Sequence, residues 1–223
     1  MNGVYEIYPS QKKSFFPSFS INSNLIIINL IFFVIFSILI YTNLAYLDYI
    51  AIKPINILQG KYFWTFLTSM FMHGGFFHIF ANMLSLFFIG SLVERILGAR
   101  RYLFFYLISG LLAGVFFVLS SLLFTSDMNS YAVGASGALF GLVGFLMIIT
   151  PNLPVYVMFI PIPIKMKYAA PGILVVLWAI SAAGNLPIGN TAHLGGLLIG
   201  IAYGLYLRKS YKNKTKYISR YFS

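Results

Sequence analysis

The chain contains no cysteine and very few charged residues. Without cysteine it cannot form disulfides, thiolate metal sites or a cysteine nucleophile. Charged residues make up 9% of the 223 residues, far below the share typical of soluble domains. Only four residues are acidic, and none lies inside a long apolar segment: Glu6, Asp48, Glu94 and Asp127. An ordinary soluble domain is therefore excluded, as is chemistry that needs two buried carboxylates.

Apolar residues dominate instead. Hydrophobic residues make up 60% of the chain and the mean hydropathy is +0.87, so lipid is the expected solvent. Segments of helical length without alternating polarity favour helices over a barrel, because backbone polar groups in lipid must be satisfied internally. We predict an all-α polytopic membrane protein with six transmembrane helices, at residues 24–47, 76–93, 102–124, 133–150, 168–184 and 191–207.

The placement of basic residues supports the six-helix count. With a cytoplasmic N-terminus, thirteen of the fifteen Lys and Arg residues fall on the inside, and only Lys53 and Lys61 lie outside. We therefore expect a cytoplasmic tail over residues 1–23, a membrane domain over 24–208 and a basic cytoplasmic tail over 209–223. The first apolar segment starts too late and is too long for a signal peptide, so the N-terminal tail is expected to be retained. The net charge of +11 suits contact with anionic membrane lipid better than contact with nucleic acid.

This orientation places four polar side chains at one depth. Ser136 and His193 each lie about 15 residues before the cytoplasmic end of their segments, which is about 22 Å above the inner boundary of the lipid core. His78 and Asn82, on the segment of residues 76–93, fall at roughly 18 to 24 Å above the same boundary. The hydroxyl and imidazole could act as nucleophile and base, and the other two side chains could donate to an oxyanion.

Glycines flank both members of the pair. Gly196, Gly200 and Gly204 follow His193 on one helical face, while Gly137, Gly141 and Gly144 form a similar stripe beside Ser136. Helix packing alone explains these stripes, but it does not explain a polar residue at the outer end of each. Taken singly, an intramembrane Asn is often an interhelical contact and a lone His is often a core residue.

Other hydrolase arrangements fit poorly. The Gly-x-Ser-x-Gly elbow fails because Ala138 takes the place of the last glycine, and no strand precedes the serine. There is no His-Glu-x-x-His zinc motif. Asp127 is the one acid that could orient His193 from the outer loop, although a solvated loop charge is the simpler interpretation.

The motifs together resemble the rhomboid intramembrane serine proteases, in the minimal six-helix form found in prokaryotes. The matching stretches are residues 73–82 (HGGFFHIFAN), 93–98 (VERILG), 134–137 (GASG) and 192–196 (AHLGG). The resemblance implies that Ser136 is the nucleophile and His193 the general base. It also implies that His78, Asn82 and the Ser136 backbone N–H form the oxyanion hole. Four residues are expected to support this site: His73, Gly134, Gly137 and Phe140.

The resemblance implies further features of the protein. Residues 48–72 look like the interfacial first loop of the family, residues 185–190 like a cap, and the fifth helix like a lateral gate. Pro161 and Pro163 resemble the cytoplasmic lead-in to that helix. The implied enzyme uses no cofactor or metal, cleaves transmembrane segments of membrane proteins, and lies in the cell membrane with its site open to the extracytoplasmic side.

Two departures from the family pattern stand out. Trp64-Thr65 replaces an expected Trp-Arg pair, which removes an arginine anchor of the first loop. Phe140 stands where a tyrosine often packs beneath the histidine, so the ring is kept and the hydroxyl is lost.

Two alternative functions stay open from the sequence. A non-catalytic relative could keep the fold and bind membrane clients, but it would be expected to lose the serine or the histidine. A transporter could use His73, His78 and His193 as metal ligands. That reading leaves the Gly-Ala-Ser-Gly turn without a role.

Overall fold

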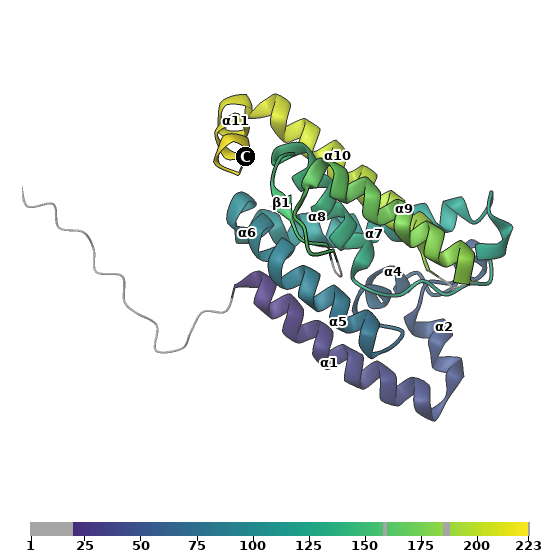
Figure 1. Cartoon of the computed structure of the whole chain (residues 1–223). Coiled ribbons are helices and arrows are strands. Elements are labelled where there is room, and N and C mark those ends of the chain that lie inside the picture. The colour runs from purple at the N-terminus through teal and green to yellow at the C-terminus, as the bar shows by residue number, and fades with distance from the viewer. Residues whose placement is uncertain (1–19, 158–159, 185–187, 223) are drawn as a thin grey trace, which may run out of the picture.

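The computed structural model describes residues 20–157, 160–184 and 188–222, and it is a bundle of helices (Figure 1). Each of the six predicted segments contains a helix. The second segment is one continuous helical run, in which α5 passes through a π-helix at Leu86–Gly90 into α6. The helices are α1 (Ile21–Thr42), α5 (Phe76–Ser85), α6 (Ser91–Leu97), α7 (Ala99–Ser120), α8 (Ser136–Ile149), α9 (Met166–Gly184) and α10 (Asn190–Ser210).

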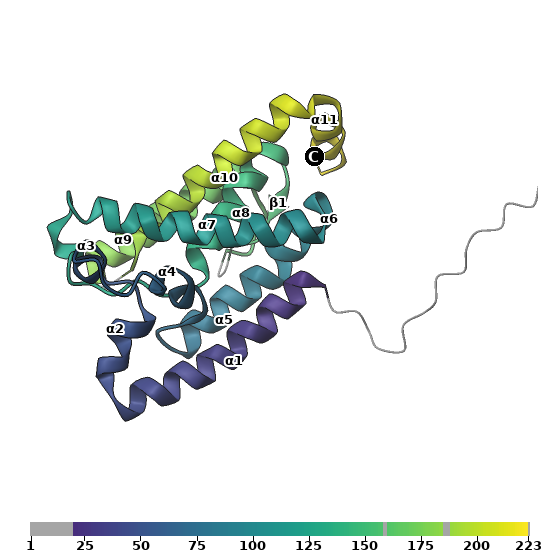
Figure 2. The ribbon, with the colours of Figure 1, turned by 180° about the vertical axis from the view of Figure 1, so that it is seen from behind.

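Within the described ranges, four helical runs are long and apolar enough to cross a membrane: α1, α5 to α6, α7 and α9. The apolar helix α8 has 14 residues. It lies inside the bundle between α7, α9 and α10 (Figures 1 and 2). The prediction of a helical membrane bundle is thus confirmed, while the count of six spans and the N-in orientation stay predictions.

Several predicted boundaries were wrong, and local backbone chemistry gives the reasons. The first helix begins at Ile21 because the Ser20 side chain accepts a hydrogen bond from the Ser23 N–H as its N-cap. It ends at Thr42, since Asn43 is extended and its side chain caps a 3-10 turn at Leu44–Tyr46. The fourth helix begins at Ser136 instead of residue 133 because Gly134 has a φ of +111°, which is not helical.

The C-terminal segment, the connection between α8 and α9 and the first loop hold further short elements. Residues 212–221 form a further helix, α11 (Lys212–Tyr221), whose Thr215 is buried. Strands β1 (Pro154–Val155) and β2 (Ile164–Lys165) pair as a short antiparallel hairpin between α8 and α9. The first loop contains the short helices α2 (Leu47–Ile50), α3 (Pro54–Leu58) and α4 (Thr65–Thr68).

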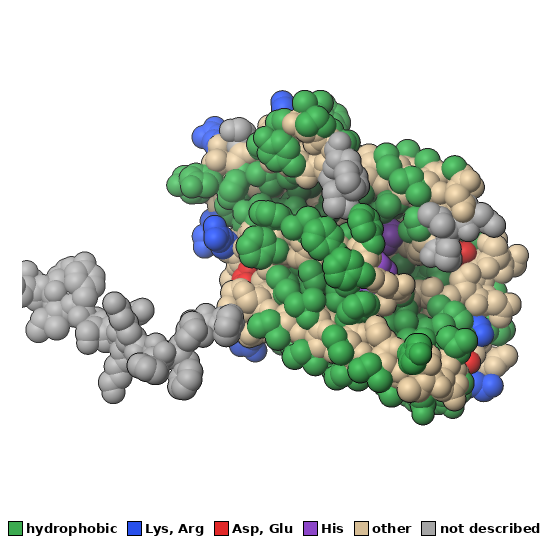
Figure 3. Space-filling view, turned by 60° about the horizontal axis from the view of Figure 1, so that its bottom comes forward, with side chains coloured by type: hydrophobic (Ala, Val, Ile, Leu, Met, Phe, Trp, Pro, Cys, Tyr) green, Lys and Arg blue, Asp and Glu red, His purple; other side chains and the backbone are tan. Residues whose placement is uncertain are grey.

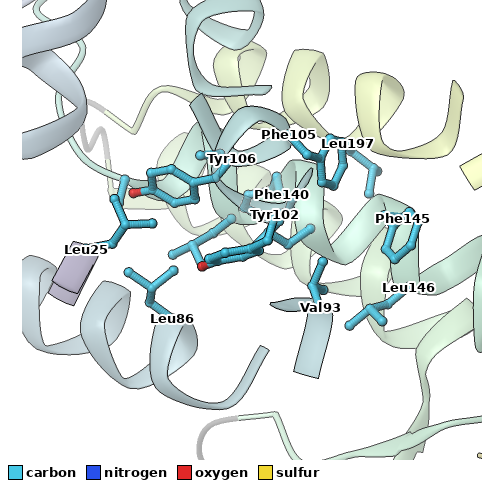
Figure 4. Close-up of a cluster of buried hydrophobic side chains, with 14 of the residues drawn as sticks. Leu25, Leu86, Val93, Tyr102, Phe105, Tyr106, Phe140, Phe145, Leu146 and Leu197 are labelled. Atoms are coloured by element: carbon cyan, nitrogen blue, oxygen red, sulfur yellow. The ribbon is translucent and has the colours of Figure 1, made fainter. Parts of the chain in front are cut away.

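The core is centred on α8, which packs against α7 and α10. A β-carbon on Gly196 or Gly200 of α10 would collide with the backbone carbonyls of Gly137 or Gly141 on α8. The two helix backbones therefore touch, as the glycine stripes predict. Figure 4 shows the buried apolar cluster of the core, which includes Phe140 and Phe145 from α8 and Leu197 from α10.

A buried polar network fixes the start of α1 against the second helical run. The Glu94 carboxylate accepts hydrogen bonds from the backbone N–H groups of Ile21 and Asn22, at 2.9 and 3.0 Å. The Asn22 side chain donates to the Leu86 carbonyl at the start of the π-helix and accepts from the Tyr102 hydroxyl at 2.6 Å. A carboxylate at a helix N-terminus also interacts favourably with the helix dipole. Glu94 therefore caps α1 from a neighbouring helix.

Candidate active site

Ser136 and His193 meet where the N-terminal ends of α8 and α10 lie together. Ser136 is the first residue of α8 and His193 lies in the first turn of α10. The distance between Ser136 Oγ and His193 Nε2 is 2.8 Å, which is a hydrogen bond. The two side chains, which the sequence places at the same depth, are therefore in direct contact. An imidazole that accepts from a hydroxyl at this distance can remove its proton during attack.

Phe140 forms one wall around the imidazole. Its ring lies one turn after Ser136 and stacks on the His193 ring, with centroids 4.6 Å apart and an interplanar angle of 19°. His193 is 7% exposed, so the ring has little freedom to turn. For Nε2 to accept from Ser136, Nδ1 must carry the ring proton. Within the described part of the chain, no side chain or backbone group is bonded to that Nδ1, Asp127 included.

The tautomer of His78 is set by a backbone N–H group just before α5. The Gly74 N–H donates to His78 Nδ1 at 3.3 Å, so Nδ1 is the acceptor and Nε2 carries the proton. The protonated Nε2 faces Gly134, where an added β-carbon would come within 2.7 Å of it. A hydrogen-bond donor thus points at the backbone two residues before Ser136.

Asn82 supplies a second donor on the same side. Its Nδ2 would lie 3.7 Å from a β-carbon at Gly134 and donates one hydrogen to the His78 carbonyl at 2.9 Å. The amide carries a second hydrogen, which remains for another acceptor. Gly134 must be glycine here for two reasons, its positive φ and the lack of room for a side chain.

His73 plays a different part from the other histidines. It is buried, and its Nε2 accepts a 3.4 Å hydrogen bond from the Ala135 N–H directly before Ser136. Burial, together with the neighbouring His78, lowers the pKa of His73 to about 3, so the ring is neutral and can accept. Its ring meets that of His78 edge-on, with centroids 5.1 Å apart. Histidine side chains are visible between apolar ones on the face shown in Figure 3.

The structure thus brings together all but one of the residues that the sequence singled out for this site. Gly137 is the exception. It packs against Ala113 of α7 and against α10, and it does not belong to the polar cluster. In the first loop, the Thr65 hydroxyl donates to the nearby Tyr62 carbonyl, while Trp64 Nε1 donates to the Tyr49 carbonyl. Part of the predicted cap, residues 185–187, lies outside the described residues.

The sequence did not predict the backbone hydrogen bonds that fix this geometry. The Gly74 N–H to His78 bond and the Ala135 N–H to His73 bond both depend on loop conformation. The paired glycines of the 73–82 motif were the available signal, since Gly75 has a φ of +155° and lets the chain turn there. Among the described residues, no three His, Asp or Glu side chains gather in a group that could hold a metal ion.

Comparisons with known proteins point to one family. A family profile described as the Rhomboid domain matches residues 60–210. The chain is 40% identical over 144 residues to RHOMBOID-like protein 1 of Arabidopsis thaliana, covering 63% of this chain and 33% of that protein. It is 32% identical over 146 residues to Rhomboid protein 1, mitochondrial, of Saccharomyces cerevisiae, covering 64% and 41%.

A third relative bears on activity. Inactive RHOMBOID-like protein 8 of Arabidopsis thaliana is 33% identical over 138 residues, covering 60% of this chain and 35% of that protein. The chain spans less than half the length of each of these curated relatives. Because the profile covers more than half of the chain, including Ser136 and His193, the protein belongs to the rhomboid family.

Proposed function

We propose that this protein is an intramembrane serine endopeptidase that uses Ser136 and His193 as a catalytic dyad. The observation that carries the proposal is the 2.8 Å contact between Ser136 Oγ and His193 Nε2 inside an apolar helical bundle. Membership of the rhomboid family supports an intramembrane protease or a related function. The donors beside the pair favour the protease.

The proposed reaction is acyl transfer to water. Ser136 Oγ attacks the scissile carbonyl while His193 Nε2 takes the hydroxyl proton, and the resulting imidazolium gives that proton to the leaving amine. His78 Nε2–H, Asn82 Nδ2–H and the Ser136 backbone N–H donate to the oxyanion. Water then attacks the acyl-enzyme, with His193 again as base, and releases Ser136.

The substrate class follows from where the site lies. Ser136 is half-buried at the start of α8, so a substrate reaches it from within the membrane or from its edge. We propose transmembrane segments of membrane proteins as substrates. We also propose a cell-membrane location with the site open to the extracytoplasmic side, where water enters, and the fifth helix, α9, as the gate through which substrate passes.

A non-catalytic client-binding function is the main alternative, since one relative is named inactive. This chain keeps a serine and a histidine in bonding contact, which client binding does not require. The transporter alternative would need a metal-binding cluster. Of the three histidines, His73 is bonded to the backbone before Ser136 and His193 to Ser136 itself, which supports the protease instead.

The test is cleavage of a reporter transmembrane substrate by the purified protein in detergent or liposomes. The parent should cleave it, and Ser136→Ala or His193→Ala should lower the rate by at least about 10³-fold. Ser126→Ala, a change of an exposed loop serine ten residues earlier, serves as the matched control and should keep the parent rate. Cleavage that persists in Ser136→Ala would refute the mechanism.

A further inference from the structure

The segment that leads into Ser136 is bonded along its length to the first loop. We define the serine-entry segment as residues 128–135 and the first loop as residues 48–72. Ile52 and Ala132 exchange two backbone hydrogen bonds, at 3.1 and 2.9 Å, as an isolated antiparallel bridge. The Gly134 N–H donates to the Ser69 carbonyl at 2.8 Å. The position of Ser136 therefore depends on how the first loop is held.

A charged cluster joins the same two segments through side chains. The Tyr131 hydroxyl donates to Asp48 Oδ1 at 2.7 Å, and Lys53 Nζ donates to the Tyr131 oxygen at 3.3 Å. Lys53 Nζ also lies 3.6 Å from Asp48 Oδ1. Asn56 Nδ2 adds a 3.1 Å bond to the same carboxylate oxygen. Tyr131 belongs to the serine-entry segment, and the other three residues of the cluster belong to the first loop.

Electrostatics keep this cluster charged at neutral pH. The hydrogen bond from Tyr131 is the main cause that lowers the pKa of Asp48, and the bond to Tyr131 is the main cause that raises the pKa of Lys53. The Asp48 side chain is 38% exposed, so the ion pair itself contributes little to global stability. The short O–H to carboxylate bond is the stronger and more directional contact.

We propose that Asp48, Lys53 and Tyr131 form a clasp that positions Ser136 by holding the serine-entry segment against the first loop. This inference rests on the proposed protease function. None of the three side chains touches the dyad, so they act as positioning residues. Catalysis is sensitive to displacements of about 1 Å in the nucleophile and in the oxyanion donors, and the Ser136 N–H and Oγ both follow directly from the clasped segment.

Tyr131→Phe tests the clasp with the smallest change, because it removes the hydroxyl and keeps the ring. Loss of the bonds from and to this hydroxyl should lower kcat about 3- to 10-fold, the range expected for one net hydrogen bond, with KM within about twofold. The unfolding midpoint should stay close to that of the parent. Tyr156→Phe, which changes a 75% exposed tyrosine outside the clasp, is the matched control and should not alter kcat.

A disulfide across the bridge should replace the clasp. The chain has no cysteine, so Ile52→Cys with Ala132→Cys introduces a single defined pair. Opposed residues of a hydrogen-bonded antiparallel pair lie about 5.5 Å apart at Cα, within the range that a disulfide spans. In the Tyr131→Phe background, oxidation should restore the parent kcat, and a reductant should remove the gain. A variant that merely damaged packing would not recover.

Amide hydrogen exchange provides a readout without activity. In a Ser136→Ala background, Tyr131→Phe should raise exchange at Ala132 and Gly134, while amides within α8 keep their protection. Unchanged kcat together with unchanged exchange would overturn the clasp. If the parent cleaves no reporter, the proposed function fails, and increased exchange would still support the clasp as the anchor of this segment.

Discussion

The ring of Phe140 lies face to face with the ring of His193, at a centroid distance of 4.6 Å. The stack holds the imidazole in the plane that directs Nε2 toward Ser136. A phenyl ring is sufficient for this contact, because stacking needs the ring face and not a hydroxyl.

Phe140→Ala should therefore reduce kcat while Phe140→Tyr keeps it. Aromatic pairs contribute about 0.5–1.5 kcal/mol beyond their buried area, which corresponds to a loss of roughly 2- to 13-fold if the contact serves the reactive orientation. Steady-state cleavage of the reporter measures this. An alanine variant with the parent kcat would show that the stack does not orient His193.

Gly134→Ala should abolish most activity without unfolding the protein. Its β-carbon would come within 2.7 Å of His78 Nε2, so it would displace a proposed oxyanion donor. Loss of one such donor costs roughly 10²- to 10³-fold in kcat. Gly60→Ala is the matched control, since Gly60 also has a positive φ, of +77°, but has no atom within 4 Å of an added β-carbon. Equal losses in both variants would point to backbone strain alone.

Gly200→Ala should destabilise the bundle. The added methyl would strike the Gly141 carbonyl and force α8 and α10 apart, at a cost of about 1–3 kcal/mol in the free energy of unfolding. Gly172→Ala on α9 meets no atom within 4 Å and should leave the unfolding midpoint unchanged or slightly raised. Thermal unfolding in one detergent compares the two. Similar midpoints would argue against backbone contact between these helices.

Asn22→Ala should loosen the start of α1. The change removes the donor to the Leu86 carbonyl and the acceptor for Tyr102, and it leaves buried polar groups unpaired at about 1–3 kcal/mol each. Asn24→Ala, at an exposed site on the same helix, is the control. The unfolding midpoint should fall for Asn22→Ala only. If Asn22→Ala and Asn24→Ala unfolded at the same midpoint, the network around Asn22 would not stabilise the bundle.

The sequence predicted the helices and the common depth of Ser136 and His193 because both follow from signals that can be counted along the chain. Apolar length and basic asymmetry place the helices, and counting residues from their ends places side chains at one depth. The glycine stripes then predict which helix faces touch. The structure agrees at the Gly196 contact with the Gly137 carbonyl.

What the sequence did not predict depends on tertiary contacts. The π-helix at Leu86–Gly90 has no distinct composition, and its first carbonyl is satisfied by Asn22 from another helix. The bond between Asp48 and Tyr131 joins residues 83 positions apart in sequence. Helix α11 in the basic C-terminal segment was not predicted either; its Thr215 is buried and its Ile218 packs against the core cluster.

The most direct test of the account is to treat the purified protein with a fluorophosphonate and map the adduct by mass spectrometry. An activated serine reacts covalently with this reagent, whereas an ordinary hydroxyl does not. The account predicts one adduct, on Ser136, formed by the parent and at least about 10²-fold more slowly by His193→Ala. An adduct on another serine, or reporter cleavage by a protein whose Ser136 stays unmodified and uninhibited, would contradict it.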